Sequence, residues 1–413
     1  MRSDPWDVII VGAGPAGLMT AITCAVKPLR VLVLDGNSRA GAKLLLSGGG
    51  RCNVTNLKVS EKNYQGGEAR TVRNVLSAFS SERAVRFFKS LGVAMVLEEG
   101  TKYFPETQSA KTVLEALLGE ARACGVILEM KKKVSRISRP DGSFRVAGEG
   151  FEYTARAVVI CTGGLSYAAT GSDGSGYGLA RTMGHTIVKT LPALTPLLTD
   201  DPDWKKLSGI TLPVRLTVTA EEKKFAASEG AFLFTHTGFS GPAVLDISGP
   251  WLRCPAVPKE LIANFLPDEN EESLRAAWVR AAADHPKWSW KRFLARYFPE
   301  RLTEVLFHKL GRDVGTPAGQ CSKKDRDALF RSLAHFPLRV TGACGYEKAE
   351  VTSGGVDLRE VNGKTLESKL QPGLYFAGEV LDVDGRIGGY NFQWAWASGF
   401  VAGKALLREL GTR

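Results

Sequence analysis

Three glycines near the N-terminus, Gly12, Gly14 and Gly17, have the spacing of a dinucleotide-binding fingerprint. The first permits a tight turn, the second lets the backbone approach a pyrophosphate, and the third lets a helix pack closely on a strand. The start of that helix offers free N–H groups and a positive dipole end to phosphates. Asp35 follows eighteen residues after Gly17, where a carboxylate can accept hydrogen bonds from a ribose. Together these residues predict a dinucleotide site.

Two further glycine-rich segments favour FAD over NAD as the dinucleotide. Residues 158–164 read as a buried strand that ends in Thr162, Gly163 and Gly164, and residues 378–391 precede the last expected helix. Segments that return to one site from distant parts of the chain suit a long, extended ligand. FAD is such a ligand, so the sequence predicts an FAD site.

The segment 378–391 contributes acidic residues and the start of a helix. Glu379 or Asp384 is expected beside the ribityl chain or the phosphates. The helix that opens at Asn391 is expected to direct its dipole at the flavin. Tyr390, next to this helix start, is one candidate catalytic proton donor.

His236 is the second candidate catalytic residue. It lies in the glycine-bounded loop 235–242, and a histidine titrates near neutral pH. The alternative is that this loop is a hinge and that His236 only binds backbone. The other histidines lie in helical or strand contexts, and no spacing of His, Asp or Glu predicts a metal site.

The densest glycine run is Ser47-Gly-Gly-Gly-Arg-Cys-Asn53. Glycines such as Gly49 allow close backbone approach to a ligand, and Arg51 and Asn53 could bind flavin oxygens or a substrate anion. A flexible surface loop would have a similar sequence. Cys52 could be a redox thiol, but no second cysteine lies near it, so an inert lining residue is favoured.

The elements that must position these residues are predicted from the hydrophobic pattern. Residues 7–11, a helix to residue 25 and residues 30–34 form a βαβ unit. The predicted fold is α/β, a discontinuous Rossmann-type FAD-binding domain with two inserts. The predicted domain ranges are 1–190 (FAD-binding, first part), 191–255 (inserted, β-rich), 256–337 (helical) and 338–413 (FAD-binding, second part).

Composition limits the classes of partner. The 413 residues include 54 Lys and Arg against 43 Asp and Glu, a net charge of +11. The charge is dispersed, and residues 251–335 hold only 15 basic against 11 acidic residues. Nucleic acid is therefore disfavoured as a partner, and a small-molecule substrate is expected.

Four of the eight tryptophans fall in or beside the segment 271–335, which is expected to be helical. They are interpreted as residues that anchor helix packing.

The seven cysteines are scattered without a C-x-x-C pair, as in proteins whose thiols are reduced. No uninterrupted apolar run of about 18 residues predicts a membrane span, and the N-terminus lacks the pattern of a signal peptide. The chain is expected to be cytoplasmic, with no membrane partner.

Several longer motifs resemble those of the BaiN/YhiN-like flavoproteins, a family of bacterial NAD(P)/FAD-dependent oxidoreductases also known as aminoacetone-oxidase-like. These motifs are Gly41-x-Lys43 with 47–56, 235–242, 351–356 and 374–399. The resemblance runs along essentially the whole chain and implies an FAD-binding Rossmann-type domain with an inserted β domain and a helical domain. Asp35 departs from the longer Glu that is usual in flavoproteins.

The fingerprint, the glycine-rich segments and this resemblance together give the predicted FAD contacts. The predicted cofactor-binding residues are Gly12, Gly14, Pro15, Ala16, Gly17, Asp35, Lys43, Gly49, Arg51, Cys52, Asn53, Thr162, Gly163, Gly164, Gly378, Glu379, Asp384, Gly388, Gly389, Tyr390 and Asn391.

The predicted function is that of an FAD-dependent oxidoreductase that takes electrons from NAD(P)H and passes a hydride to a small carbonyl or unsaturated substrate. The sequence has no second G-x-G-x-x-G, so NAD(P)H is expected to dock transiently. The alternatives are an oxygen-dependent FAD amine oxidase, a flavoprotein that acts on RNA, and a non-enzymatic flavin redox sensor.

Overall fold

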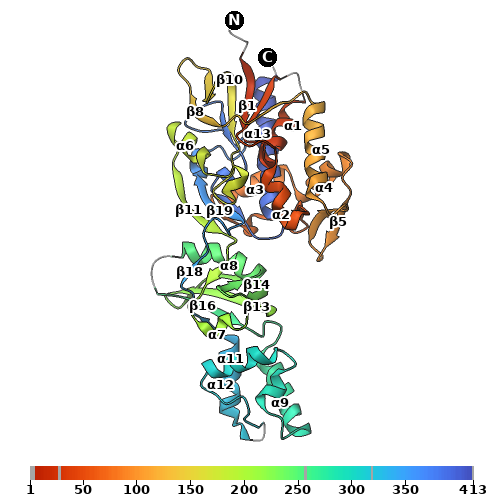
Figure 1. Ribbon diagram of the computed structural model, residues 1–413, viewed down its shortest axis with the longest axis vertical. Coiled ribbons are helices and arrows are strands. Elements are labelled where there is room, and N and C mark those ends of the chain that lie inside the picture. The colour runs from red at the N-terminus through yellow and green to blue at the C-terminus, as the bar shows by residue number, and fades with distance from the viewer. Residues whose placement is uncertain (1–4, 27–28, 255–257, 318–319, 412–413) are drawn as a thin grey trace. The chain divides into compact units, whose positions relative to one another are not determined.

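The computed structural model describes residues 5–26, 29–254, 258–317 and 320–411. The chain forms two compact units (Figure 1). The first unit consists of residues 1–192 and 349–413, so it is built from both ends of the chain, and the second consists of residues 193–348.

The first unit is organised around a mixed sheet with five parallel strands. The strand order is β7-β2-β1-β10-β9-β8, and β20 also pairs with β10. Residues 8–11 of β1 form an unbroken apolar run because this part of the strand is buried on both faces, with Val8, Ile9 and Ile10 fully inaccessible. The strands are β1 (Trp6–Val11), β2 (Val31–Asp35), β7 (Ile127–Met130), β8 (Val134–Ser138), β9 (Phe144–Gly148), β10 (Phe151–Ile160) and β20 (Leu374–Phe376).

Helices from both ends of the chain pack together in this unit (Figure 1). Gly399 and Gly403 of α13 make the contact close, because a Cβ would lie 2.5 Å from Ala16 O at the first and 2.8 Å from Thr20 O at the second. The helices are α1 (Pro15–Cys24), α2 (Ala42–Gly50), α3 (Ala69–Ala78), α4 (Ser81–Ser90), α5 (Ala110–Ala123), α6 (Ser175–Thr182) and α13 (Tyr390–Leu410).

Short strands and 3₁₀ turns complete the first unit. Three small sheets join β3 with β6 and β5, β4 with β21, and β11 with β19. These elements are β3 (Thr55–Asn56), β4 (Tyr64–Gly66), β5 (Met95–Glu98), β6 (Lys102–Pro105), β11 (Ile187–Ala193), β19 (Val351–Val356), β21 (Val383–Gly385), η1 (Glu61–Asn63), η2 (Ala168–Thr170), η4 (Leu358–Glu360) and η5 (Gly378–Val380).

The second unit contains an antiparallel sheet and a group of helices. The strand order is β17-β16-β13-β14-β15-β12-β18. Its elements are β12 (Leu197–Leu198), α7 (Pro202–Lys205), β13 (Thr211–Ala220), β14 (Lys223–Phe234), β15 (Gly238–Ser240), α8 (Pro242–Arg253), β16 (Lys259–Asn264), α9 (Glu271–Asp284), α10 (Trp290–Leu294), α11 (Glu300–Lys309), α12 (Lys323–Ala334), β17 (Phe336–Leu338) and β18 (Gly342–Ala343).

Aromatic side chains fill the core of the second unit. Trp204 stacks on Phe234 with ring centroids 5.6 Å apart, and Trp278 stacks on Trp290 at 3.7 Å. Strand β16, which falls in the segment expected to be helical, pairs with β13 and contributes to the same sheet. The mixed α/β class with a Rossmann-type parallel sheet is confirmed. Among the described residues, no helix has the length and apolar character needed to cross a membrane.

Candidate functional site

The fingerprint glycines form the turn between β1 and α1. Gly12 has φ +109°, and a Cβ there would lie 2.5 Å from Cys161 O, directly after the neighbouring strand β10. A Cβ on Gly17 would lie 1.9 Å from Gly12 O. No larger residue fits either position, so the turn and the close approach of α1 to the sheet both require glycine.

Gly14 differs from the other two because it faces open space. Its φ is −80°, which any residue can adopt, and a Cβ there would have no neighbour within 4 Å. Gly14 is the N-cap of α1 without a side-chain cap, and Pro15 and Ala16 open the helix. The first N–H groups of a helix have no partner inside it, so they are available to an anion beside Gly14.

Asp35 lies at the end of β2, close to this turn. One carboxylate oxygen accepts from Ala13 N at 2.8 Å and the other from Asn37 N at 2.8 Å. These bonds fix the orientation of the short side chain. Each carboxylate oxygen still has a lone pair, so the carboxylate can also accept from a ribose hydroxyl.

The Thr162–Gly164 segment follows β10 at the same edge of the sheet. Thr162 Oγ1 is buried and has no hydrogen-bond partner among the described residues. Gly163 has φ +74°, and a Cβ on Gly164 would lie 2.4 Å from Thr352 Oγ1. The hydroxyl of Thr162 faces Gly176 in α6, where a Cβ would lie 1.8 Å from Oγ1, so Gly163, Gly164 and Gly176 are all required by close packing.

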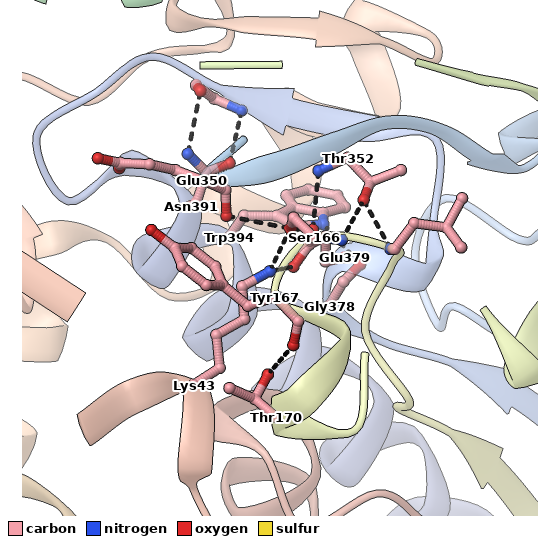
Figure 2. Close-up of polar contacts among 12 residues, drawn as sticks. Lys43, Ser166, Tyr167, Thr170, Glu350, Thr352, Gly378, Glu379, Asn391 and Trp394 are labelled. Atoms are coloured by element: carbon pink, nitrogen blue, oxygen red, sulfur yellow. Dashed lines mark hydrogen bonds and ion pairs between the residues drawn. The ribbon is translucent and has the colours of Figure 1, made fainter. Parts of the chain in front are cut away.

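Lys43 and Glu379 form an ion pair in which Lys43 Nζ lies 2.6 Å from Glu379 Oε2 (Figure 2). Lys43 Nζ also donates to Ser166 Oγ at 2.7 Å. Glu379 Oε1 accepts from Thr352 N at 2.8 Å and from Ser166 Oγ at 3.1 Å. Helix α2, the segment after β10, strand β19 and turn η5 therefore meet at one carboxylate, in what we call the Glu379 cluster (Lys43, Ser166, Thr352 and Glu379).

Gly378 places this cluster beside the fingerprint helix. Its φ is +80°, and a Cβ on it would lie 2.8 Å from the Cβ of Ala16 in α1. Its N–H donates to Ser398 Oγ at 2.9 Å, and its carbonyl accepts from Trp394 Nε1 at 3.1 Å. The glycine-rich segments from the two ends of the chain are thus in contact.

The segment after the triple glycine packs on the start of α13. When the side-chain amide of Asn53 is oriented so that both its atoms face complementary groups, its oxygen accepts from Gly389 N at 3.2 Å and its nitrogen donates to Thr55 O at 3.0 Å. Asn56 Nδ2 donates to Gly388 O at 2.9 Å. The two glycines have φ +113° and +92°, so they form the turn that leads into the helix.

The residues around the start of α13 are mostly engaged with backbone. Asn391 Oδ1 accepts from Gly385 N at 2.8 Å, and its Nδ2 donates to Gly385 O at 3.0 Å. Asp384 is buried in β21, and the carbonyl of Tyr390 accepts from Tyr64 Oη at 2.9 Å. The side chain of Asn391 therefore shapes the turn, while the helix N-terminus has no side-chain cap.

The triple glycine interrupts α2 rather than forming an extended loop. Ser47, Gly48 and Gly49 have non-helical dihedrals, and a Cβ on Gly49 would meet nothing within 4 Å. Arg51 binds Glu98 and Gln108, each at 3.0 Å. Its guanidinium is therefore already occupied by protein groups.

Cys52 is fully buried. Burial raises the pKa of its thiol to about 12. A thiol with so high a pKa is protonated near neutral pH and is not a nucleophile, which agrees with its interpretation as an inert residue.

His236 lies in the second unit, on the exposed turn before β15. Its Nδ1 is 3.0 Å from Ser208 Oγ. The other predicted site residues belong to the first unit. A catalytic role for His236 stays a prediction.

Sequence reasoning did not single out Ser166, Tyr167 or Thr352 individually. Ser166 binds both Lys43 and Glu379, and Thr352 Oγ1 accepts from Leu165 N at 2.7 Å. The sequence contains only a weak indication of them: Ser166 and Tyr167 come two and three residues after Gly164, and Thr352 lies in the 351–356 motif.

These features fit FAD. The open space at Gly14 at the start of α1 suits a pyrophosphate, and the carboxylate of Asp35 is near that start. The uncapped start of α13 is available to another part of a long ligand.

A family model described as the HI0933-like protein Rossmann domain matches residues 6–405. The chain belongs to the HI0933-like family. This agrees with the resemblance to the BaiN/YhiN-like flavoproteins and identifies the chain as an FAD-dependent oxidoreductase.

Curated relatives match over nearly their whole length. The ribosomal RNA dihydrouridine synthase of Escherichia coli is 34% identical over 97% of this chain and 98% of its own. The 3-dehydro-bile acid delta(4,6)-reductase of Clostridium scindens is 32% identical over 96% of this chain and 98% of its own.

Solved structures share the fold at lower identity. The 3-ketosteroid-delta4-(5alpha)-dehydrogenase of Rhodococcus jostii has a TM-score of 0.50 and 16% identity, over 98% of both chains.

Proposed function

We propose that this HI0933-like protein reduces a carbon–carbon double bond conjugated to a carbonyl, with NAD(P)H as the source of electrons. The observation that carries the proposal is that two full-length relatives, named for different substrates, share this chemistry by name. Dihydrouridine differs from uridine by saturation of the double bond conjugated to the C4 carbonyl. A delta(4,6)-3-keto steroid has a dienone. Bound FAD supplies the hydride for such a reduction.

The residues of the first unit divide the task of holding FAD. The start of α1 and the backbone at Gly14 would bind the pyrophosphate, and Asp35 the ribose. The N–H groups at the start of α13 would face the flavin, and Asn391 would hold the turn that positions them. Tyr390 and His236 are proposed as proton donors. Arg51 would contact a ligand only after its ion pair with Glu98 breaks.

The electron donor can be tested directly on the FAD-loaded protein. Under anaerobic conditions we expect NADPH or NADH to bleach the oxidised-flavin absorbance within seconds. A subsequent addition of 2-cyclohexenone, which has a conjugated double bond, should restore the absorbance. Bleaching by a primary amine but by neither nicotinamide would support the amine-oxidase alternative. Slow reaction with every donor and acceptor would support the sensor alternative.

A second candidate is a uridine of ribosomal RNA as the substrate, since two curated relatives carry that name. One surface of the second unit favours it. His285 stacks on Trp288 with centroids 4.2 Å apart, and Arg292 and Arg296 lie 5.6 and 5.9 Å from the same ring. We call these four residues the Trp288 face.

The Trp288 face keeps its positive charge available. Within the described part of the chain, neither Arg292 nor Arg296 forms an ion pair, whereas Lys291 of α10 is paired with Glu300 and Glu304. Guanidinium groups held by an aromatic ring rather than by a carboxylate retain their full charge for phosphates. Trp278 and Trp290 are buried packing residues as expected, and Trp288 packs partly buried against the same core, so part of its ring stays accessible.

Charge reversal at the Trp288 face tests the RNA candidate. We expect Arg292→Glu with Arg296→Glu to weaken binding of an unmodified ribosomal RNA transcript at least about tenfold and to lower the salt slope by about 2. The matched control is Lys323→Glu with Lys324→Glu, two exposed lysines at the start of α12. Equal losses in both double variants would indicate a non-specific charge effect and would count against this face.

A further inference from the structure

We propose that Tyr167 is a catalytic residue that donates the proton to the substrate carbon next to the carbonyl during the reduction. This assignment rests on the proposed function. Tyr167 follows Ser166 of the Glu379 cluster directly and precedes turn η2. Three features of Tyr167 carry the inference: its backbone conformation, its hydroxyl and its position.

The backbone of Tyr167 is held in a conformation that bulky residues rarely adopt. Its φ is 56° and its ψ is 53°, in the left-handed region. Such strain persists only where the surroundings enforce it, and it clusters at functional sites. At Tyr167 it fixes the direction of the ring, because a relaxed backbone would turn the side chain elsewhere.

Contacts on both sides enforce this conformation. Before it, Ser166 is fully buried and bonded to Lys43, Glu379 and the Glu350 carbonyl. After it, the Tyr167 carbonyl accepts from both the N–H and the hydroxyl of Thr170, each at 2.7 Å. Thr170 O in turn accepts from Asn37 Nδ2 at 2.8 Å, which ties the turn to the end of β2.

The hydroxyl of Tyr167 is free to serve a ligand. Among the described residues it forms no hydrogen bond, although tyrosine hydroxyls at partly buried positions usually have a partner. Tyr64, Tyr153 and Tyr375 of the same unit all donate to protein oxygens. Partial burial, and then the carboxylate of Glu350, raises the pKa of Tyr167 above its usual value, so the phenol stays protonated at neutral pH.

The position of Tyr167 places the phenol at the predicted cofactor site. Figure 2 shows its ring in the group that includes Lys43, Glu379 and Asn391, with the hydroxyl pointing away from the Lys43–Glu379 contact. Asn391 belongs to the start of α13, which we propose for the flavin. A substrate bound there would meet the phenol without disturbing the Glu379 cluster.

The step that Tyr167 performs is balanced. Hydride addition to the carbon β to the carbonyl leaves an electron pair on the α carbon of the substrate. The O–H bond of Tyr167 breaks as the α C–H bond forms, and the resulting tyrosinate takes a proton from water. NAD(P)H supplies the two electrons. A phenol with a raised pKa regains its proton readily near neutral pH.

Tyr167→Phe separates this role from cofactor binding. The lost hydroxyl has no protein partner, so we expect normal folding, normal FAD content and unchanged bleaching by NAD(P)H. Re-oxidation by 2-cyclohexenone, a 4,6-dien-3-one steroid or unmodified ribosomal RNA should slow about 100-fold. Re-oxidation by ferricyanide, which needs no proton on carbon, should not change. The matched control is Tyr103→Phe, because the hydroxyl of Tyr103 also forms no hydrogen bond among the described residues.

Each outcome has a definite reading. Slowing with the alkenes alone supports Tyr167 as the proton donor. If Tyr167→Phe is re-oxidised by alkenes as fast as the wild type, Tyr167 is not the donor and Tyr390 and His236 are next. If no alkene re-oxidises the wild type, the proposed function fails and the assignment of Tyr167 fails with it. If ferricyanide re-oxidation slows equally, Tyr167 acts on the flavin site and not on substrate carbon.

Discussion

Gly14→Leu is expected to give a folded protein that purifies without FAD. The leucine side chain would enter the open space where a Cβ has no neighbour within 4 Å, and the backbone φ of −80° suits any residue. The folded chain therefore tolerates the change, but the pyrophosphate can no longer approach the start of α1. Loss of about 3 kcal/mol of binding free energy corresponds to about a hundredfold weaker binding.

The measurement is the ratio of flavin to protein absorbance after gel filtration, with circular dichroism as the test of folding. Gly119→Leu is the matched control, because Gly119 in α5 of the same unit also has no neighbour within 4 Å of a Cβ. We expect this control to retain FAD. Normal FAD content in Gly14→Leu would show that the fingerprint turn does not hold the cofactor.

Glu379→Ala is expected to destabilise the first unit by about 2 kcal/mol, a value reduced for partial exposure of the ion pair. The substitution leaves Lys43 without a counter-charge and removes the acceptor for Thr352 N and Ser166 Oγ. The side chains of Lys43 and Glu379 are 22% and 19% exposed, so water compensates only partly. A buried donor without a partner is costly.

Hydrogen exchange of the FAD-free protein measures this effect unit by unit, since the two units need not unfold together. Peptides from β19 and from residues 162–170 should exchange faster, while β13 and β14 should not change. Glu229→Gln is the control: it breaks the pair with Arg215, whose side chains are 48% and 49% exposed, and should cost less than about 1 kcal/mol. Unchanged exchange in β19 would contradict a structural role for Glu379.

The parts of the site that depend on local spacing could be predicted from sequence. The turn at Gly12 and Gly17, the strand before it and the acid at the end of β2 all lie within 30 residues of one another. Local spacing determines such a turn, so the βαβ unit was predicted almost to its ends. The family resemblance extended the prediction from this βαβ unit to the fold class of the chain. The structure and the family match confirm that fold class.

The Glu379 cluster could not be predicted in the same way. Lys43 and Glu379 are 336 residues apart, and Ser166 and Glu379 are 213 apart. Which side chains meet across such distances is decided by packing of the whole unit rather than by a local pattern. Tyr167 was missed because its left-handed backbone leaves no mark in the sequence, where positive φ is expected at glycine.

Strand β16 shows a similar limit. Its residues Lys259–Asn264 fall near the start of the range 256–337, which is predicted to be helical, and they form a strand by pairing with β13 and β17. Tertiary pairing thus overrode the local texture of the sequence.

The division of the first unit between residues 1–192 and 349–413 has a consequence for biosynthesis. On the ribosome, α1 emerges early, but its partner α13 is translated more than 360 residues later. Residues 193–348 are contiguous, so the second unit can fold while the ribosome is still adding the rest of the chain. Throughout that interval the nascent chain exposes the apolar face of α1, and the cofactor site is assembled only when α13 arrives.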